Sequence, residues 1–199
     1  MVDIVVKVGG GLLPHGDDLD GTLATIGAAG LERRLLVVPG GGPFADAVRA
    51  VDRQRKLSDD AAHWMAVLAM DQYAYLVAAR LAQAVLVTDR NAIAAALSAH
   101  RLPVLAPFRW MQAVDPLPHT WDVTSDSIAA WVAGELGARR LVLIKPPGAV
   151  RSAARDAELV DAYFSRAIPI GVEVVILSAD QQMALRFTVG QGVGTQDSR

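Results

Sequence analysis

The sequence predicts a three-layer α/β/α sandwich built around a mainly parallel sheet. Short β-branched runs alternate with longer segments of helical period along the whole chain. The short runs are apolar almost throughout, which is typical of strands covered by helices on both faces. The chain has 199 residues and is 52% hydrophobic, so it can form one substantial core. We therefore expect a single domain over residues 1–199.

The predicted elements follow this alternation in order. Apolar runs predict strands at residues 3–8, 34–39, 102–107, 140–145 and 172–177. Helical spacing predicts helices at residues 19–29, 43–54, 90–100, 125–136 and 158–167, with a short one from residue 180. We expect the longest helix over residues 61–83, because Ser58 can cap it and Asp59 and Asp60 favour its first turn. Residues 108–120 carry aromatics and prolines without a clear period and are predicted to be a loop.

Charge and composition argue against nucleic acid, membranes and metal ions as binding partners and favour small molecules. The 19 basic and 21 acidic residues form no long block of one sign, so no footprint for nucleic acid or an anionic membrane is present. The chain has no cysteine, and its four histidines lack metal-ligand spacing, so we expect no resident metal site. The first residues read as a strand rather than a secretory leader, and no apolar run is long enough to span a bilayer. The expectation is a cytoplasmic protein that binds small molecules.

Two runs of three glycines each follow an apolar strand: "KVGGG" ends with Gly9, Gly10 and Gly11, and "VPGGG" ends with Gly40, Gly41 and Gly42. Successive glycines leaving a strand expose several backbone N–H groups in one concavity, which suits phosphate oxygens. Either run alone could equally be a tight connection between a strand and a helix. Lys7 favours the phosphate interpretation, because a cation at the end of an apolar strand needs an anionic partner or an outward path.

Other phosphate motifs fit less well. The chain has no G-x-x-x-x-G-K-[ST], which excludes a P-loop NTPase. Residues 40–45 do match the G-x-G-x-x-A dinucleotide fingerprint after a strand. That fingerprint needs an acid at the end of the next strand, yet the acids at the right distance, Asp59 and Asp60, begin a predicted helix.

A polar turn enters the predicted helix at residues 125–136. Asp122 and Asp126 flank Thr124 and Ser125, and Ser127 adds a further hydroxyl. An ordinary helix cap would need only one of these side chains. Two carboxylates and three hydroxyls together therefore indicate a site as well as a cap.

In their order along the chain, these segments resemble the amino-acid kinase family. The matching segments are "KVGGG", "VVPGGGPFADAVR", "TSDSIAAWVA" and the closing "GQGVGT". The resemblance covers essentially the whole chain and implies an amino-acid kinase-like fold and an ATP-dependent kinase that uses Mg²⁺. It also implies that Lys7 contacts the transferred phosphoryl group and that Asp126 organises the basic groups. Positioning and fixed positive charge are what phosphoryl transfer mainly requires.

The resemblance assigns the remaining site residues as well. It implies that the phosphate is bound by Gly9, Gly10 and Gly11. It implies that the acceptor is held by Gly40, Gly41 and Gly42, with Asp122 where some members place a substrate-contacting asparagine.

The nucleotide end departs from the family pattern. After the strand at 140–145, members usually carry T-D-x-D-G, whereas this chain has Lys145, two prolines and Gly148. We therefore expect Lys145 and Gly148 to bind the nucleotide. The G-G-M-x-x-K pattern that brings a second lysine is also missing, and Lys145, Arg151 or Arg155 could supply its charge, although all three could equally be solvated cations.

The short length of the chain resembles that of the compact members of the family, and this favours the acceptor of one such branch. That branch phosphorylates [5-(aminomethyl)furan-3-yl]methyl phosphate in methanofuran biosynthesis, a part of one-carbon metabolism, and we associate "LVDAYF" loosely with it. The ammonium of such an acceptor would need a carboxylate, for which the candidates are Asp59, Asp60 and Asp71.

Several alternatives stay open at this point. The acceptor could be uridylate, isopentenyl phosphate or an amino acid. The chain could also be a nucleotide-binding or storage protein of the same fold that has lost catalysis. The apolar helix from Ala61 to Ala82 has more hydrophobic surface than one side of a sheet can readily cover, which favours a homodimer or larger assembly.

Overall fold

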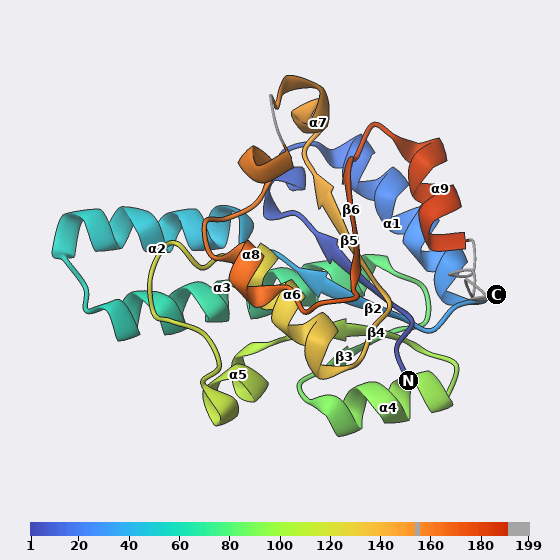
Figure 1. Ribbon diagram of the computed structural model, residues 1–199, viewed down its shortest axis with the longest axis horizontal. Coiled ribbons are helices and arrows are strands. Elements are labelled where there is room, and N and C mark those ends of the chain that lie inside the picture. The colour runs from blue at the N-terminus through green and yellow to red at the C-terminus, as the bar shows by residue number, and fades with distance from the viewer. Residues whose placement is uncertain (154–155, 191–199) are drawn as a thin grey trace.

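A computed structural model describes residues 1–153 and 156–190 (Figure 1). Within this part of the chain six strands form one sheet, in the order β3-β4-β2-β1-β5-β6, and every neighbouring pair is parallel. The strands are β1 Ile4–Val8, β2 Leu35–Pro39, β3 Ala84–Val87, β4 Leu102–Leu105, β5 Arg140–Lys145 and β6 Glu173–Ser178. The predicted parallel sheet is confirmed.

Helices cover both faces of this sheet (Figure 1). The α-helices are α1 Gly16–Gly30, α2 Gly42–Arg55, α3 Asp59–Arg80, α4 Arg90–Ser98, α5 Phe108–Val114, α6 Ser125–Glu135, α7 Ala149–Ser152, α8 Phe164–Ala167 and α9 Gln182–Gly190. Two 3₁₀ turns, η1 Gly10–Leu12 and η2 Asp156–Leu159, complete the described elements. No helix within residues 1–153 and 156–190 is long and apolar enough to cross a membrane.

Two apolar clusters, one on each face, account for the three layers. One cluster contains Ile128 of α6 and Phe164 of α8, and the other contains Leu23 of α1 and Leu185 of α9. Every residue of β1 and β2 is buried, as expected for strands at the centre of a covered parallel sheet. The helix α3 contributes to both clusters, because its first half packs on one face and its second half on the other.

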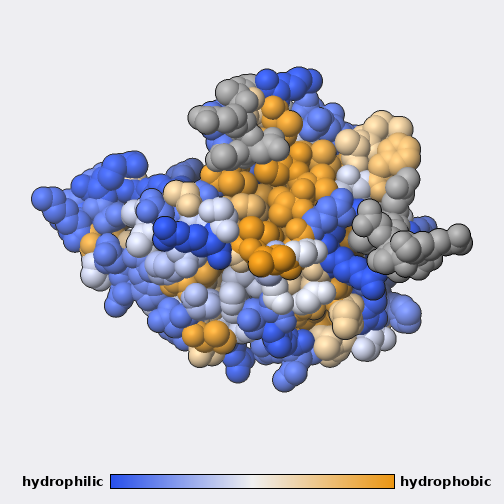
Figure 2. Space-filling model, in the orientation of Figure 1, coloured by the Kyte–Doolittle hydropathy of each residue, from blue (hydrophilic) through white to orange (hydrophobic). Residues whose placement is uncertain are grey.

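The sheet is less covered at β6, which pairs with β5 alone. Figure 2 shows apolar side chains gathered over this side of the molecule, near β6 and α8. Val174 and Ile176 of β6 are only partly buried, whereas Leu141 and Leu143 on β5 are fully buried. The central strands are thus the fully buried part of the sheet, and the glycine runs and Lys145 lie at their carboxyl ends.

The structure corrects three predicted elements. The strand β3 was not expected, because its four apolar residues follow directly on the helix predicted over residues 61–83 and look like more of that helix, whereas α3 ends at Arg80. The predicted loop at 108–120 begins with α5, whose first amide, Phe108 N–H, donates to the carboxylate of Asp71 at 3.0 Å. The predicted helix at 158–167 is broken into η2 and α8. The start of α5 is set by the carboxylate of Asp71, which lies far back in the sequence. The break between η2 and α8 falls at Asp161, whose carboxylate accepts from Tyr163 N–H.

Candidate phosphoryl-transfer site

The two glycine runs lie at the carboxyl ends of β1 and β2 and pack directly against each other. A Cβ atom added at Gly10 would lie 2.1 Å from the backbone nitrogen of Gly42, and one added at Gly40 would lie 2.7 Å from the nitrogen of Gly10. Neither distance is possible between real atoms, so the close approach itself requires glycine at these positions. Gly42 also has a φ of +54°, which disfavours other residues there.

Backbone N–H groups of these runs are left without partners in the protein. Within the described part of the chain, the amides of Gly10 and Gly11 donate no hydrogen bond to another residue. The helix α2 begins at Gly42 without a side-chain cap, so its first amides also stay unsatisfied. Unsatisfied amides at a helix start and in a glycine turn form a favourable place for an anion.

A buried carboxylate lies between two buried ammonium groups at the carboxyl ends of β1 and β5, and the first glycine run follows β1 directly. Lys7 at the end of β1 places Nζ 2.8 Å from Oδ1 of Asp126. Lys145 at the end of β5 places Nζ 2.6 Å from Oδ2 of the same carboxylate. The exposed fractions are only 5% for Lys7, 5% for Asp126 and 9% for Lys145. The cluster therefore carries one uncompensated positive charge, which a bound anion would neutralise.

The titration of this cluster follows from the same contacts. Burial acts against the charged form of Asp126, but the two ammonium groups hold the pKa of this carboxyl below its usual value. Burial and the neighbouring Lys7 lower the pKa of Lys145, while Asp126 opposes that shift. The Lys145 contact is a hydrogen bond, whereas Lys7 meets Asp126 at ion-pair distance without hydrogen-bond geometry. The ammonium N–H groups of Lys7 can therefore donate hydrogen bonds to another acceptor.

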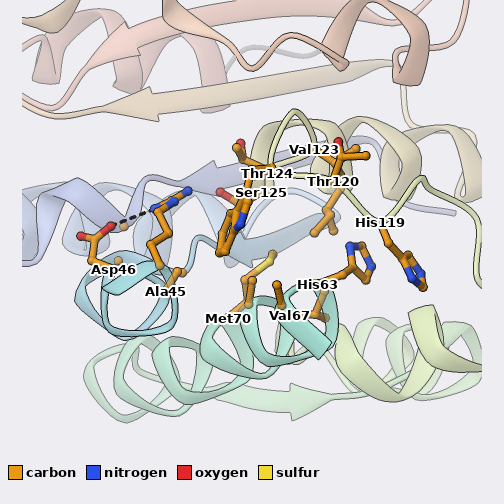
Figure 3. A pocket seen from close by; sticks show the side chains of 18 of the residues that line it. Ala45, Asp46, His63, Val67, Met70, His119, Thr120, Val123, Thr124 and Ser125 are labelled. Atoms are coloured by element: carbon orange, nitrogen blue, oxygen red, sulfur yellow. Dashed lines mark hydrogen bonds and ion pairs between the residues drawn. The ribbon is translucent and has the colours of Figure 1, made fainter. Parts of the chain in front are cut away.

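A cavity of about 330 Å³ opens beside the glycine runs (Figure 3). Its walls come from α2, from the first half of α3 and from residues 119–125. Figure 3 shows Val67 and Met70 on one wall, with Thr124 and Ser125 facing them across the cavity. A space of this size suits one small metabolite.

Charged and aromatic groups surround the cavity away from the glycines. Arg49 pairs with Asp46 at 2.8 Å, and its guanidinium lies 4.9 Å from the centre of the Trp121 ring. At the other side His63 stacks on His119 with ring centres 4.1 Å apart. The cavity can therefore offer both charge and flat apolar surface to a ligand.

The pKa values of the two histidines shift in opposite directions. His119 lies 2.6 Å from Asp60 and 2.8 Å from Asp115, and these carboxylates raise its pKa although burial opposes them. Burial and the adjacent His119 lower the pKa of His63 to about 4. His63 is consequently neutral near pH 7. From the sequence, His63 could be expected to face a substrate pocket, and it does line the cavity. Its stacking on His119 could not be predicted, because the two residues meet only in the folded chain.

The sequence model of the amino acid kinase family matches residues 4–161. The chain belongs to the amino acid kinase family. A curated relative, the [5-(aminomethyl)furan-3-yl]methyl phosphate kinase of Methanocaldococcus jannaschii, is 25% identical over 143 residues. The match covers 70% of this chain and 63% of the relative, so it spans less than two thirds of the relative's length.

Solved structures with the same fold include three UMP (uridylate) kinases. UMP kinase from Ureaplasma parvum has a TM-score of 0.67 at 12% identity and covers 96% of each chain. UMP kinase from Bacillus anthracis has a TM-score of 0.64 at 14% identity, covering 96% of this chain and 93% of that one. Uridylate kinase from Archaeoglobus fulgidus has a TM-score of 0.57 at 17% identity, covering 72% and 63%. These likenesses confirm the expected fold.

The residues expected at the phosphoryl position are only partly at the cavity, because four of the glycines line it whereas Lys7, Asp126 and Lys145 are not among the described residues of its wall. Lys7 and Asp126 are in contact, and the cavity is lined by Gly10, Gly11, Gly41 and Gly42. Gly9 and Gly40 lie behind them, with Gly9 N–H bonded to the carbonyl of Ile144 and Gly40 N–H to that of Val8, both at 2.9 Å. These last two glycines therefore shape the loops rather than offer amides to a ligand.

The expected acceptor residues separate into two groups. Asp59 lines the cavity. Asp60 is held by His119, and Asp71 accepts its hydrogen bond from Phe108 N–H, so neither is among the described residues of the cavity wall. Asp122 is exposed and is likewise not among them.

At the nucleotide end, Lys145 lies in the charged cluster, whereas Gly148 does not. Gly148 has a φ of +74°, and its N–H donates to Asp180 at 3.0 Å. Arg151 pairs with the same Asp180 at 2.9 Å. Arg155 and most of the closing "GQGVGT" fall on 154–155 and 191–199, outside the described residues.

Proposed function

We propose that this member of the amino acid kinase family is an ATP-dependent phosphotransferase acting on a small phosphorylated metabolite. One observation carries the proposal: Asp126 holds Lys7 and Lys145 together beside the free amides of Gly10 and Gly11. Phosphoryl transfer depends on fixed positive charge around the transferred group more than on covalent chemistry by the protein. Lys145 would then supply the second cation that the family draws from another segment.

The proposed reaction needs no general base. An oxygen of the acceptor's phosphate would form a bond to the γ-phosphorus of ATP as the bond from that phosphorus to the bridging oxygen breaks. ADP leaves with the electron pair of that oxygen. The attacking oxygen is already anionic, so no proton has to be removed. Lys7, Lys145 and the glycine amides would stabilise the charge on the transferred group.

Mg²⁺ is expected to enter with the nucleotide. No group of three or more histidine, cysteine or acidic side chains within residues 1–153 and 156–190 could hold a metal ion. The protein residues thus do not form a metal cage, and Mg²⁺ bound mainly by nucleotide phosphates is its usual arrangement. When bound, the ion would neutralise phosphate charge.

The favoured acceptor is [5-(aminomethyl)furan-3-yl]methyl phosphate. The named relative from Methanocaldococcus jannaschii supports this choice at 25% identity. The acceptor's phosphate would lie on the cavity side of the glycine runs, because Gly10 and Gly42 touch and leave no room between them. Val67 and Met70 would face its ring, and Asp59 is the free carboxylate available for its ammonium. Uridylate, isopentenyl phosphate and amino acids stay as alternatives.

A panel of acceptors with Mg-ATP tests this function. ADP release is measured with the aminomethyl-furan phosphate, uridylate and isopentenyl phosphate, with Lys7→Ala as the inactive control. Turnover that is fastest with the amine and slower in Asp59→Asn supports the assignment. Preference for uridylate would change the acceptor and leave the transfer chemistry in place.

A second candidate function is nucleotide binding without catalysis. It is favoured by the end of β5, where Pro146 packs against Gly11 in place of the family's acidic turn; a Cβ on Gly11 would lie 2.8 Å from Pro146. Equilibrium binding of Mg-ATP without ADP release for any acceptor would support this function and contradict the first.

We also propose that two copies associate through α3. Its exposed side carries Met65, Leu68 and Tyr75, which are 37%, 41% and 68% exposed. Apolar groups of this size in one row are typical of a contact between subunits. The cytoplasmic location expected from the sequence stays a prediction.

A further inference from the structure

Asp161 receives an unusual number of hydrogen bonds for a half-buried side chain. It lies between η2 and α8, in the "LVDAYF" segment. Its Oδ2 accepts from Thr124 N–H at 3.0 Å, from the Thr124 hydroxyl at 2.7 Å and from Ser127 N–H at 3.0 Å. Its Oδ1 accepts from the Ser127 hydroxyl at 2.5 Å and from Tyr163 N–H at 3.1 Å.

These bonds cap α6 from outside the helix. The local cap is weak, since the Thr124 hydroxyl oxygen accepts from Asp126 N–H at 3.3 Å. Asp161 satisfies two further amides at this helix start and places a negative charge at the positive end of the helix dipole. The start of α6 is thus fixed by a residue that lies far along the chain.

Asp126 stands between the two residues that Asp161 holds. Its neighbours on the first turn, Thr124 and Ser127, each give Asp161 both an amide and a hydroxyl hydrogen bond. With both ends of the turn fixed, the Asp126 carboxylate is aimed at Lys7 and Lys145. We propose that Asp161 is a positioning residue for the phosphoryl transfer proposed above, acting through Asp126 and Lys145. This role rests on that proposed function.

Besides fixing the start of α6, the Asp161 carboxylate acts on Lys145 through its negative charge. The groups that act on Lys145 are Lys7 from β1, Asp126 from α6 and Asp161 from the segment before α8. Burial and Lys7 lower the pKa of Lys145, and Asp126 and Asp161 oppose them. Without the Asp161 charge, Lys145 loses its proton at a lower pH.

Kinetics of Asp161→Asn test the proposal. The variant keeps the size of the side chain and removes its charge. We expect kcat to fall about 10- to 100-fold, because small misplacements of reacting groups cost that much, with both KM values within about threefold. The alkaline limb of the pH–kcat profile should move to lower pH. Glu173→Gln is the matched control: Glu173 pairs with Arg140 at 2.8 Å at the opposite end of β5, so its loss should leave both kcat and the profile unchanged.

A measurement without catalysis separates this inference from the proposed function. NMR titration of the Lys145 side chain in labelled protein should show a lower pKa in Asp161→Asn than in the unaltered chain. If the unaltered protein has no kinase activity but the titration shifts, the proposed function fails while the positioning of the cluster stands. An unchanged kcat together with an unchanged Lys145 titration would overturn the inference.

If Asp161→Asn does not fold, Ser127→Ala tests the positioning role of Asp161 instead. It deletes one donor to Asp161 and leaves the carboxylate in place. A several-fold loss of kcat with KM unchanged supports the positioning role, and a kcat equal to that of the unaltered chain contradicts it.

Discussion

In the cluster of Lys7, Asp126 and Lys145, substitutions of the lysines and of the aspartate should have different effects, because the cluster has two cations and one carboxylate. Two cations share one carboxylate, so the cluster is electrostatically short of one anion. Removing one lysine leaves a balanced pair, whereas removing the aspartate leaves two buried cations without a carboxylate in contact with them. The two kinds of substitution should therefore act on different properties of the protein.

Lys145→Met should lower kcat while leaving stability nearly unchanged. We expect a loss of about 100- to 1000-fold in kcat, comparable with removing one donor from a site that stabilises developing charge. The melting temperature should stay within a few degrees, since Asp126 keeps Lys7 as its partner. Asp126→Ala is the contrast, with an expected loss of about 3–5 kcal/mol in the free energy of unfolding. A Lys145→Met variant with full kcat would show that Lys145 takes no part in the transfer.

Among the elements, those set by local pattern were predicted and those set by distant contacts were not. β1, β2 and β5 follow from their apolar runs, and the glycine runs and Lys7 could be placed from the sequence. Lys145 could be suspected, but its contact with Asp126 required the parallel pairing of β1 and β5. α5 begins at the carboxylate of Asp71, a contact across 37 residues that no local signal announces.

Asp71 links α3 to α5, and its titration should be visible in stability. Burial raises its pKa to about 6 although Phe108 N–H favours the charged form. The folded state therefore holds a proton that the unfolded state releases between about pH 4 and pH 6, so Asp71 lowers the free energy of unfolding as pH rises through that window, and the loss persists above it.

Asp71→Asn should remove this effect and keep the hydrogen bond from Phe108. We expect the variant to be more stable at pH 7.5 by up to about 3 kcal/mol, with a higher melting temperature, and equal to the unaltered chain near pH 3, where Asp71 is protonated in both the folded and the unfolded state. His63 titrates with the opposite sign, but it is present in both proteins and cancels in the difference. Asp17→Asn, an exposed carboxylate, is the control. A stability difference independent of pH would contradict the assignment.

At the scale of the whole molecule, the site and the exposed side of α3 belong to one helix. The inner side of α3 lines the cavity with His63 and Met70, and the outer side carries Leu68 and Tyr75. A subunit contact on the outer side would fix the helix that forms the cavity wall. Assembly and acceptor binding would then depend on the same element.

The proposed association through α3 is tested by its exposed apolar residues. Sedimentation at micromolar concentration should give a dimer or larger species for the unaltered chain and a monomer for the Leu68→Glu, Tyr75→Glu double variant. Phe187→Glu on α9, a residue 60% exposed, should leave the assembly intact. A monomer in the unaltered chain would rule the contact out.

The contact between the two glycine runs has a consequence for how this site can change its ligand. The backbones of Gly10, Gly40 and Gly42 approach so closely that a side chain on any of them would clash with the other loop. No side chain can therefore be added at this contact without forcing the two loops apart. The floor therefore has a fixed shape, and under the proposed function it would contact the phosphate group that the candidate phosphorylated acceptors share. Any change of preferred acceptor has to come from the walls, above all from α3 and residues 119–123, where side chains can be enlarged, shortened or charged independently of the phosphate cradle.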